Sequence, residues 1–525
     1  MIWLKEYSTI SSLARHFRAL LRSCSRNSAL EIGQKLHATA ITTGLLTLSF
    51  PNSFLRNTIL HMYAACGVSL SARKLFDEIP QAYKDTVDWT ALMNCFNRSD
   101  LQNETLGLFI DMRKLGVLVD DVTMVSVFSA CSKLGNGRFG SQCHACMIKL
   151  AFGYSVKACN STMDMYVKCG LIHESTRIFH EMMNERNIVS WTVRLEGAVK
   201  WEGLESARLV FDEMPERNEV AWTIMIVAYV ENGSLLEAFA LLKEMIFGHG
   251  LGLNFVTICS LLSACTQLGD VTMGRWIHVY ALKMMDEEIN VVVATALIDM
   301  YSKCGRVNSA LRVFKMMPLR NVIMWNAMLN GLAMHGMGGM VLDMFDQMVK
   351  EVQPDDVTFT AILSACSHSG LIDEGRHFFY NLELMYGIRP SIEHYACIVD
   401  LLGRAGHLEE AEAIVRQMPM QPNAMVLGSL LGSCSFHNKL KLGEGLMQEL
   451  LHLYPQNTEY HILLSNMYAS EGNHDRADSL RGVLKVKGIR KVPGLSFIQL
   501  GGKVHQFFAG DNNYTQVKGN EMVKI

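Results

Sequence analysis

The chain has 525 residues, more than a single hydrophobic core usually serves, so several domains or an array of repeats is expected. Apolar residues make up 49% and charged residues 19%, which excludes an extended disordered chain. The 10 prolines are few for this length and favour an all-α fold over a many-stranded sandwich. A net charge of −3 argues against a nucleic-acid binder that depends on phosphate neutralisation, but it does not exclude the reading of individual bases.

The cysteines and the apolar runs limit the class of protein further. The 14 cysteines recur inside apolar helical stretches, which favours small buried residues in a reducing compartment. Cys143 and Cys146 form a lone Cys-x-x-Cys without a second pair nearby, so a packing role is favoured over zinc. No run reaches the roughly 18 consecutive apolar residues of a membrane-spanning helix. We therefore predict no membrane partner, no metal and no cofactor.

The N-terminal segment is basic and open to two interpretations. The first 28 residues contain five lysines and arginines and one acid, Glu6, which resembles an organelle transit peptide. Helical apolar spacing begins by about Ala14, so the alternative is a solvated first helix. On the first interpretation, residues 1–13 are the remnant of a targeting segment.

Internal repetition is the strongest feature of the remaining sequence. Three motif series recur along the chain, and a tryptophan follows the third series within about ten residues. The series are HMYAACG (61–67), DMYVKCG (164–170) and DMYSKCG (299–305); SACS (129–132), SACT (263–266) and SACS (364–367); and LFDEIP (75–80), VFDEMP (210–215) and VFKMMP (313–318). The tryptophans that follow the third series are Trp89, Trp222 and Trp325, and Trp191 occupies the same place in a further copy. Three independent series at matching intervals exclude chance similarity.

The spacing of these series defines the unit. Tyr63 and Tyr166 lie 103 residues apart, and Trp191 and Trp222 lie 31 apart, so a superperiod of about 102 contains three units of roughly 31 to 36 residues. Within a unit the apolar residues follow helical spacing on either side of a glycine-containing turn, which predicts a helical hairpin. One hairpin cannot bury both of its apolar faces, so the units are expected to stack into an α-solenoid.

Units of this length with MYxKCG and LFDEMP motifs resemble the plant pentatricopeptide-repeat (PPR) family, in its PLS subfamily of alternating standard, long and short repeats. The resemblance implies an α-α hairpin superhelix of about twelve repeats over residues 14–423. Long repeats are placed at 14–52, 121–155, 255–290 and 356–391; short ones at 53–85, 156–187, 188–218, 291–321 and 392–423; and standard ones at 86–120, 219–254 and 322–355.

Beyond residue 423 the sequence pattern changes. Residues 424–491 resemble the paired C-terminal extension (E) motifs of RNA-editing family members, and 492–511 are similar to the E+ module that follows them, with Pro493 and Gly494 at its Pro-Gly step. The tail 512–525 resembles nothing in the family. The His-x-Glu and Pro-Cys-x-x-Cys zinc signature of the family's DYW deaminase is not evident. His407-Leu408-Glu409 is interpreted as a solvated helix start, and no catalysis is predicted.

The resemblance also implies which residues read RNA. In this family one repeat faces one base, and the fifth residue of the first helix together with the last residue of the repeat sets the preference. The pairs are Asn57 with Asp85, Thr90 with Asp120, Asn160 with Asn187, Thr192 with Asn218, Thr223 with Asn254, Thr295 with Asn321, and Asn326 with Asp355. Helix capping is an alternative explanation of the last residue. It does not explain Asn and Thr inside a helix, where they are mediocre helix formers.

The family code implies a target. Asn with Asp favours U, Thr with Asp favours G, Thr with Asn favours A, and Asn with Asn a pyrimidine, which yields 5′-U-G-N-Y-A-A-N-A-U-3′. Two weakly read bases, three unread bases and the edited C are then expected to follow. The long repeats carry Val125 and Cys259 at the fifth position, and the last short repeat pairs Ala396 with Asn423, so these are expected to be poor readers.

The sequence therefore predicts a protein that binds one single-stranded organellar RNA and specifies a C-to-U editing site. A cytidine deaminase and other editing-complex proteins are expected to act in trans, in the mitochondrion or alternatively in the chloroplast. Two rival functions remain open, an organellar RNA stability or splicing factor and a protein-interaction scaffold of helical repeats.

Overall fold

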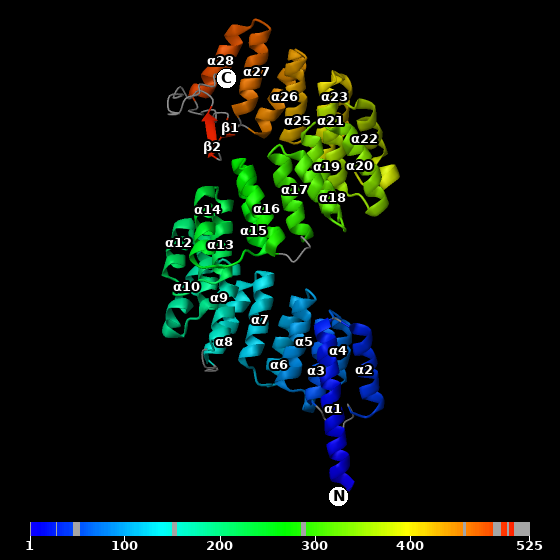
Figure 1. Cartoon of the computed structure of the whole chain (residues 1–525), viewed down its shortest axis with the longest axis vertical. Helices are drawn as coiled ribbons and strands as arrows, with labels where there is room; N and C mark the ends of the chain where they lie inside the picture. Colours follow the sequence, from blue (N-terminus) through cyan, green and yellow to red (C-terminus); the bar gives the residue numbers. More distant parts are fainter. Residues whose placement is uncertain are drawn as a thin grey trace. The chain divides into compact units, whose positions relative to one another are not determined.

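The computed structural model describes residues 2–27, 29–45, 53–149, 155–284, 290–454, 458–486, 495–500 and 503–508. These residues are almost wholly helical, and Figure 1 follows the helices in chain order. The chain forms two compact units, Met1–Ala228 and Tyr229–Ile525. None of the helices in the described ranges combines the length and apolar character that a bilayer crossing requires.

The first unit consists of helical hairpins. Its first helices are α1 (Ile2–Asn27), α3 (Ser53–Ala65), α5 (Thr86–Arg98), α7 (Asp121–Leu134), α9 (Val156–Lys168) and α11 (Ile188–Gly197). Its second helices are α2 (Leu30–Thr42), α4 (Ser69–Glu78), α6 (Gln102–Lys114), α8 (Gly137–Lys149), α10 (Ile172–Glu181) and α12 (Leu204–Glu213). Short turns of helix η1 (Gln81–Tyr83), η2 (Met183–Glu185) and η3 (Ala198–Glu202) join some of them, and α13 (Glu219–Glu231) crosses the boundary between the units.

The second unit repeats this plan. After α14 (Leu235–Lys243) and η4 (Glu244–Gly248), its first helices are α15 (Phe255–Leu268), α17 (Val291–Lys303), α19 (Val322–Met334), α21 (Asp356–Ser369), α23 (Ile392–Arg404), α25 (Ala424–Phe436) and α27 (Thr458–Ser470). The second helices are α16 (Val271–Met284), α18 (Val307–Met316), α20 (Gly338–Glu351), α22 (Ile372–Tyr386), α24 (Leu408–Gln417), α26 (Leu440–Leu453) and α28 (His474–Val486).

Within each unit the helices form two layers. From α1 to α11 and from α15 to α27 a first helix packs on the first helix of the next hairpin, as α5 does on α7 and α19 does on α21. The second helices from α2 to α10 and from α16 to α26 contact their own first helix and the one that follows. The first helices thus form a continuous layer with one surface available to a ligand. The predicted fold class, an α-solenoid of helical hairpins, is confirmed.

Local signals decide where the helices begin and end. From α3 to α23 every first helix begins at the residue where the sequence places the start of a repeat. The glycine of the KCG motif ends the first helix in a left-handed conformation, with φ of 76° at Gly170 and 74° at Gly305. The first hairpin differs, because α1 begins at Ile2, upstream of the expected repeat start at residue 14.

The recurring motifs are packing contacts between hairpins. The tryptophan that opens a first helix meets the preceding phenylalanine edge to face, with ring centroids 4.7 Å apart for Phe314 and Trp325. Arg320 lies over the Phe314 ring, 4.9 Å from its centroid. The same contact recurs at Phe76–Trp89, Phe179–Trp191 and Phe211–Trp222. The phenylalanine and tryptophan motifs therefore form one type of packing contact between hairpins, which occurs at these four places.

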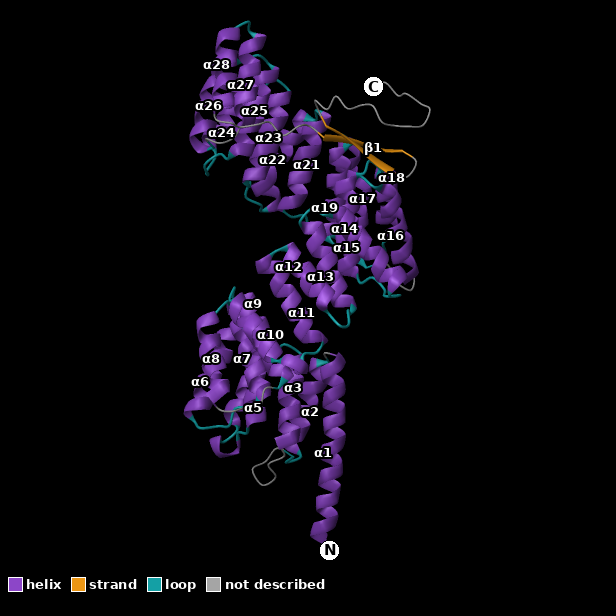
Figure 2. Ribbon diagram, turned by 90° about the vertical axis from the view of Figure 1, so that its left-hand side faces the viewer, coloured by secondary structure: helices purple, strands orange, loops and turns teal. Residues whose placement is uncertain are grey.

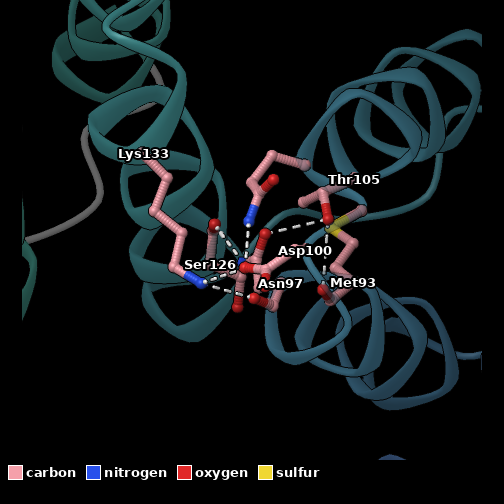
Figure 3. A network of polar contacts seen from close by, with 7 residues as sticks. Met93, Asn97, Asp100, Thr105, Ser126 and Lys133 are labelled. Carbon is pink, nitrogen blue, oxygen red and sulfur yellow. Dashed lines mark hydrogen bonds and ion pairs between the residues drawn. The ribbon is translucent and has the colours of Figure 1, made fainter. Parts of the chain in front are cut away.

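A polar network joins three helices of the first unit (Figure 3). Asn97 on α5 donates from Nδ2 to the carbonyl of Ser126 on α7 at 2.8 Å and accepts from Thr105 Oγ1 on α6 at 2.9 Å. Lys133 donates to the Asn97 carbonyl at 2.7 Å and pairs with Asp100 at 3.2 Å. Because Asn97 and Thr105 are buried, these bonds satisfy groups that would otherwise destabilise the joint between the hairpins.

The segment after residue 423 begins as further hairpins. Helix α25 packs on α23, and α27 on α25, so residues 424–486 continue the two layers. Strands β1 (Leu495–Leu500) and β2 (Lys503–Phe508) then form an antiparallel hairpin in which Ile498 is paired with His505. Figure 2 shows these strands in orange, the only non-helical regular elements among the described residues. The sequence did not predict this hairpin, and Pro493, Gly494 and the tail 512–525 lie outside the described residues.

The cysteines are free thiols, and all are buried or half-buried. Burial raises the pKa of Cys143 to about 12, so it is a protonated packing residue, as expected. Within the described ranges no cluster of three His, Cys, Asp or Glu side chains is placed to hold a metal. His407 is exposed at the start of α24, which confirms its interpretation as a solvated helix start.

Candidate nucleic-acid interface

The last residue of each repeat caps the next first helix. Asp85, Asp120, Asn187, Asn218, Asn254, Asn321 and Asp355 each accept from a backbone N–H two or three residues ahead through a side-chain oxygen, at 2.7 to 3.0 Å. The capping explanation of this position is therefore confirmed. It also has a geometric consequence, since capping holds the side chain at the start of a first helix, beside the fifth residue of the preceding one.

Two of the predicted pairs are joined directly. Asn160 Nδ2 donates to Asn187 Oδ1 at 3.2 Å, and Asn326 Nδ2 donates to Asp355 Oδ1 at 2.9 Å. Each bond links adjacent first helices of the layer, α9 with α11 and α19 with α21. Residues 27 and 29 positions apart in the sequence thus form single polar groups, as a two-residue reading unit requires.

A third pair is joined through an intermediate. The Thr90 hydroxyl lies 2.8 Å from that of Thr123, which lies 2.6 Å from Asp120 Oδ1. The other threonines turn back on their own helices: Thr192, Thr223 and Thr295 donate to the carbonyls of Ile188, Glu219 and Val291, each at 2.8 Å. No hydrogen bond joins Thr192 to Asn218 or Thr295 to Asn321 within the part of the chain that the structure describes.

Asn57 and Asp85 carry the same residue types as Asn326 and Asp355 without the same contact. Asn57 Oδ1 is buried and has no hydrogen-bond partner among the described residues. Three residues after Asp85, Asp88 is fully buried and forms an ion pair with Arg56 at 2.7 Å. Burial raises the pKa of Asp88 above its ordinary value and outweighs the hydrogen bonds and the charge of Arg56, which lower it.

The side chains at the fifth position of the first helices are mostly buried. Asn57, Thr90, Asn160, Thr192, Thr223 and Asn326 are 5% to 9% exposed, and Thr295 is half-buried. The pair of Asn160 and Asn187 is not sealed between helices, since both residues line an open pocket with Val156, Val189 and Val193. A planar base entering this pocket would meet apolar walls and the polar pair.

The sequence analysis missed a further position on the first helices, which is apolar beside most of the pairs. From α3 to α21 the second residue of every first helix but α9 is solvent-exposed although apolar, from 39% exposed at Val122 to 66% at Phe54. The series is Phe54, Val87, Val122, Val189, Val220, Val256, Val292, Ile323 and Val357, with Lys157 in its place on α9. It lies three positions before the fifth residue and so shares its helix face, which is the signal that could have found it.

Ion pairs balance charge at the ends of three first helices. In three short repeats a cation in the last turn of the first helix pairs with an aspartate four residues earlier: Lys168 with Asp164, Lys303 with Asp299, and Arg404 with Asp400, at 2.8 to 2.9 Å. Such partly exposed pairs contribute little to stability. This local balance agrees with the net charge of −3.

Comparison with known proteins decides the family. A model described as PPR repeat matches residues 157–186, 220–247, 292–322, 357–384 and 393–421, and one described as PPR repeat family matches 320–368. A mitochondrial pentatricopeptide repeat-containing protein of Arabidopsis thaliana, At5g15340, is 53% identical over 507 residues, which cover 95% of this chain and 81% of the relative. The chain belongs to the pentatricopeptide-repeat family. An E motif model matches residues 437–499, in the predicted C-terminal extension.

Further relatives agree with the predicted compartment. A second mitochondrial pentatricopeptide repeat-containing protein of Arabidopsis thaliana, At2g22410, is 38% identical over 462 residues, covering 88% of this chain and 67% of the relative. The mitochondrial localisation is thereby confirmed, with chloroplastic names among other relatives as the alternative. Among solved structures, that of the maize pentatricopeptide repeat protein PPR10 matches with a TM-score of 0.49 and 17% identity over 90% of this chain and 78% of that one.

Proposed function

We propose that this PPR protein binds a single-stranded RNA in the plant mitochondrion and reads it one base per repeat. The observation that carries the proposal is the joined polar pair, Asn160 with Asn187 and Asn326 with Asp355, each formed between adjacent first helices. Single-stranded bases expose their Watson–Crick edges to such pairs, and side chains at fixed repeat spacing can read them in register.

The apolar second residues support the same function. Each lies on the ligand side of a first helix and leaves aliphatic or aromatic surface in water, which is unfavourable unless something covers it. A base stacked between the second residues of adjacent repeats would cover that surface and set its edge toward the polar pair. The balanced charge leaves base contacts as the source of selectivity.

The register is tested by binding. Under the family code the nine repeats from residue 53 to 355 read 5′-U-G-N-Y-A-A-N-A-U-3′. In a gel-shift titration we expect this RNA to bind at least about tenfold more tightly than its complement, since each well-made contact discriminates by ~1 kcal/mol or more. Equal affinity for the two RNAs would refute the register.

We further propose that RNA binding specifies a C-to-U editing site and that residues 424–511 recruit a cytidine deaminase and other editing-complex proteins in trans. The support is the E motif match at 437–499. Sequencing mitochondrial transcripts from plants that lack the protein tests this proposal, and we expect one C-to-U site to be lost. Intact editing with a missing or unspliced transcript would instead favour the RNA stability or splicing function.

A further inference from the structure

A third side chain takes part in each joined pair. It is the third residue of the following first helix, three positions after the last residue of the repeat. Thr358 donates from Oγ1 to Asn326 Oδ1 at 2.7 Å, Ser190 donates to Asn160 Oδ1 at 2.7 Å, and Thr123 contacts Thr90 at 2.8 Å. These three hydroxyls are buried, and each also contacts the capping oxygen of the pair, at 2.6 to 3.1 Å.

The cap fixes the orientation of the asparagine amide at Asn326. Asp355 Oδ1 accepts from the backbone N–H of Thr358 at 2.9 Å. Burial raises the pKa of Asp355, but hydrogen bonds from Asn326 and Thr358 outweigh it and leave the pKa below its ordinary value, so the carboxylate is ionised and can only accept. Asn326 must therefore turn its NH2 group toward Asp355 and its carbonyl toward Thr358. The carbonyl is then held toward Thr358, and one amide hydrogen remains for a ligand.

The same logic holds where the cap is neutral. Asn187 Oδ1 accepts from the backbone N–H groups of Val189 and Ser190, both at 3.0 Å, so its oxygen cannot be exchanged with its nitrogen. Asn160 must donate to that oxygen, and its own carbonyl faces Ser190. Asn160 thus also has one amide hydrogen left for a ligand, while its carbonyl is held toward Ser190.

Threonine at the fifth position gives the opposite polarity. Thr123 lies between the Asp120 carboxylate, which can only accept, and the Thr90 hydroxyl, which can donate or accept, so its one hydroxyl hydrogen goes to Asp120. Thr90 must then donate to Thr123, which leaves Thr90 with lone pairs and no donor for a ligand. The chain of bonds therefore turns asparagine into a donor and threonine into an acceptor.

Where the third residue has no hydroxyl, this coupling is missing. Ala221 and Met324 follow Asn218 and Asn321, and there Thr192 and Thr295 bond back to their own helices. The pair of Thr223 and Asn254 belongs to both units and is outside this comparison. Within one unit, the fifth residue of a first helix thus hydrogen-bonds to the next first helix where the third residue of that next helix carries a hydroxyl.

We propose that Thr123, Ser190 and Thr358 are positioning residues that set the hydrogen-bond polarity of the fifth residue and so sharpen base selection. The proposal rests on the proposed RNA-reading function. For Asn326, a carbonyl held toward Thr358 and one remaining amide hydrogen favour O4 of uracil, whereas cytosine presents an amino donor at that place. A carbonyl released from Thr358 can accept from the cytosine amino group, so loss of the hydroxyl should erode the preference for U over C.

The test uses the full chain and two RNAs that differ only by U or C opposite repeat 322–355. For Thr358→Val, which is isosteric, we expect the U-over-C affinity ratio to fall about three- to tenfold, the worth of one neutral hydrogen bond. Thr358→Ser restores the hydroxyl and should keep the ratio within about twofold of the parent. Thr257→Val removes an equivalent bond to a cap, 3.0 Å to Asn254 Oδ1, and should leave the ratio at this nucleotide unchanged.

Melting curves of each variant confirm folding, and Thr358→Ala is the second variant should the valine disturb the helix start. A folded Thr358→Val or Thr358→Ala protein with an unchanged U-over-C ratio would overturn the positioning role while leaving RNA reading intact. A parent chain that binds all four bases equally at this nucleotide would overturn the proposed function itself, and the positioning role with it.

Discussion

Repeats 53–85 and 322–355 carry the same predicted pair and build it differently. In the second, Asn326 and the backbone N–H of Thr358 donate to Asp355, and the Thr358 hydroxyl donates to Asn326, which closes a set of hydrogen bonds. In the first, the third residue is Asp88, whose carboxylate is held by Arg56, and Asn57 Oδ1 has no partner within the described residues.

The difference teaches that two residues per repeat do not define a reading unit. A carboxylate at the third position has no hydrogen to give, so it cannot hold an asparagine carbonyl. Identical pairs can therefore differ in rigidity, and a rigid pair binds its base more tightly because less conformational entropy is lost on binding.

The largest effect is expected at Arg56. Arg56→Met should lower the free energy of unfolding of the first unit by about 3–5 kcal/mol, because it leaves a buried carboxylate without its partner. The pKa of Asp88 is already raised in the folded protein, so stability falls as the pH rises from the pKa of the unfolded state to that of the folded state. Loss of Arg56 raises the pKa of the folded state further and so extends this pH range upward. Denaturation at about pH 5 and about pH 7.5 should show the greater loss at the higher pH.

The control for this experiment is Arg73→Met. Arg73 forms an exposed ion pair with Asp77 at 3.0 Å, and its loss should change stability by no more than about 0.5 kcal/mol. Equal losses in the two variants, or a loss for Arg56→Met that does not depend on pH, would contradict the buried ion pair as the feature that sets this repeat apart.

Exchange of the fifth residue should switch base preference. Asn326→Thr places threonine before Thr358 and Asp355, the combination found in Thr90, Thr123 and Asp120. We expect preference at one nucleotide to move from U to G by about tenfold or more, since acceptor replaces donor. Binding to four RNAs that vary at that base measures the change, and a preference that stays at U would show that the pair is assigned to the wrong nucleotide.

Removal of the two asparagines should have unequal effects. Asn326→Ala breaks a satisfied set of bonds and should lower stability by ~1 kcal/mol and affinity for the U-containing RNA about three- to tenfold. Asn57→Ala removes a buried oxygen that has no partner in the described chain, so its stability should change by less than about 0.5 kcal/mol and its affinity by less than about threefold. Matched melting and gel-shift experiments test this, and equal losses would mean that both pairs are equally ordered.

The smallest effect concerns the apolar series. Lys157 interrupts it on α9, and Lys157→Val should raise RNA affinity about two- to threefold by adding apolar contact with a base. Base preference opposite repeat 156–187 should stay the same, because Asn160 and Asn187 are untouched. Weaker binding by this variant would instead show that Lys157 contacts a phosphate.

Sequence patterns predicted the repeat starts well because the signals are local. A polar cap, an apolar helical period and a glycine in the turn lie within one unit, so the start of α5 at Thr86 and of α19 at Val322 can be read directly. The strand pair at 495–508 was missed, because the all-α composition of the repeats dominates the sequence and six-residue strands carry weak signals. The early start of α1 was missed because its basic composition also fits a targeting segment.

By itself the sequence determined the hairpin unit, its spacing, the family and the identity of the polar pairs, since these follow from patterns within about 36 residues. Only the tertiary structure decided which pairs are joined. Asn326 contacts Thr358, which lies 32 residues away on another helix. Asp88, the third residue of repeat 86–120, pairs with Arg56 of the repeat before it. Such contacts depend on how adjacent helices pack, and no residue spacing within one repeat encodes them.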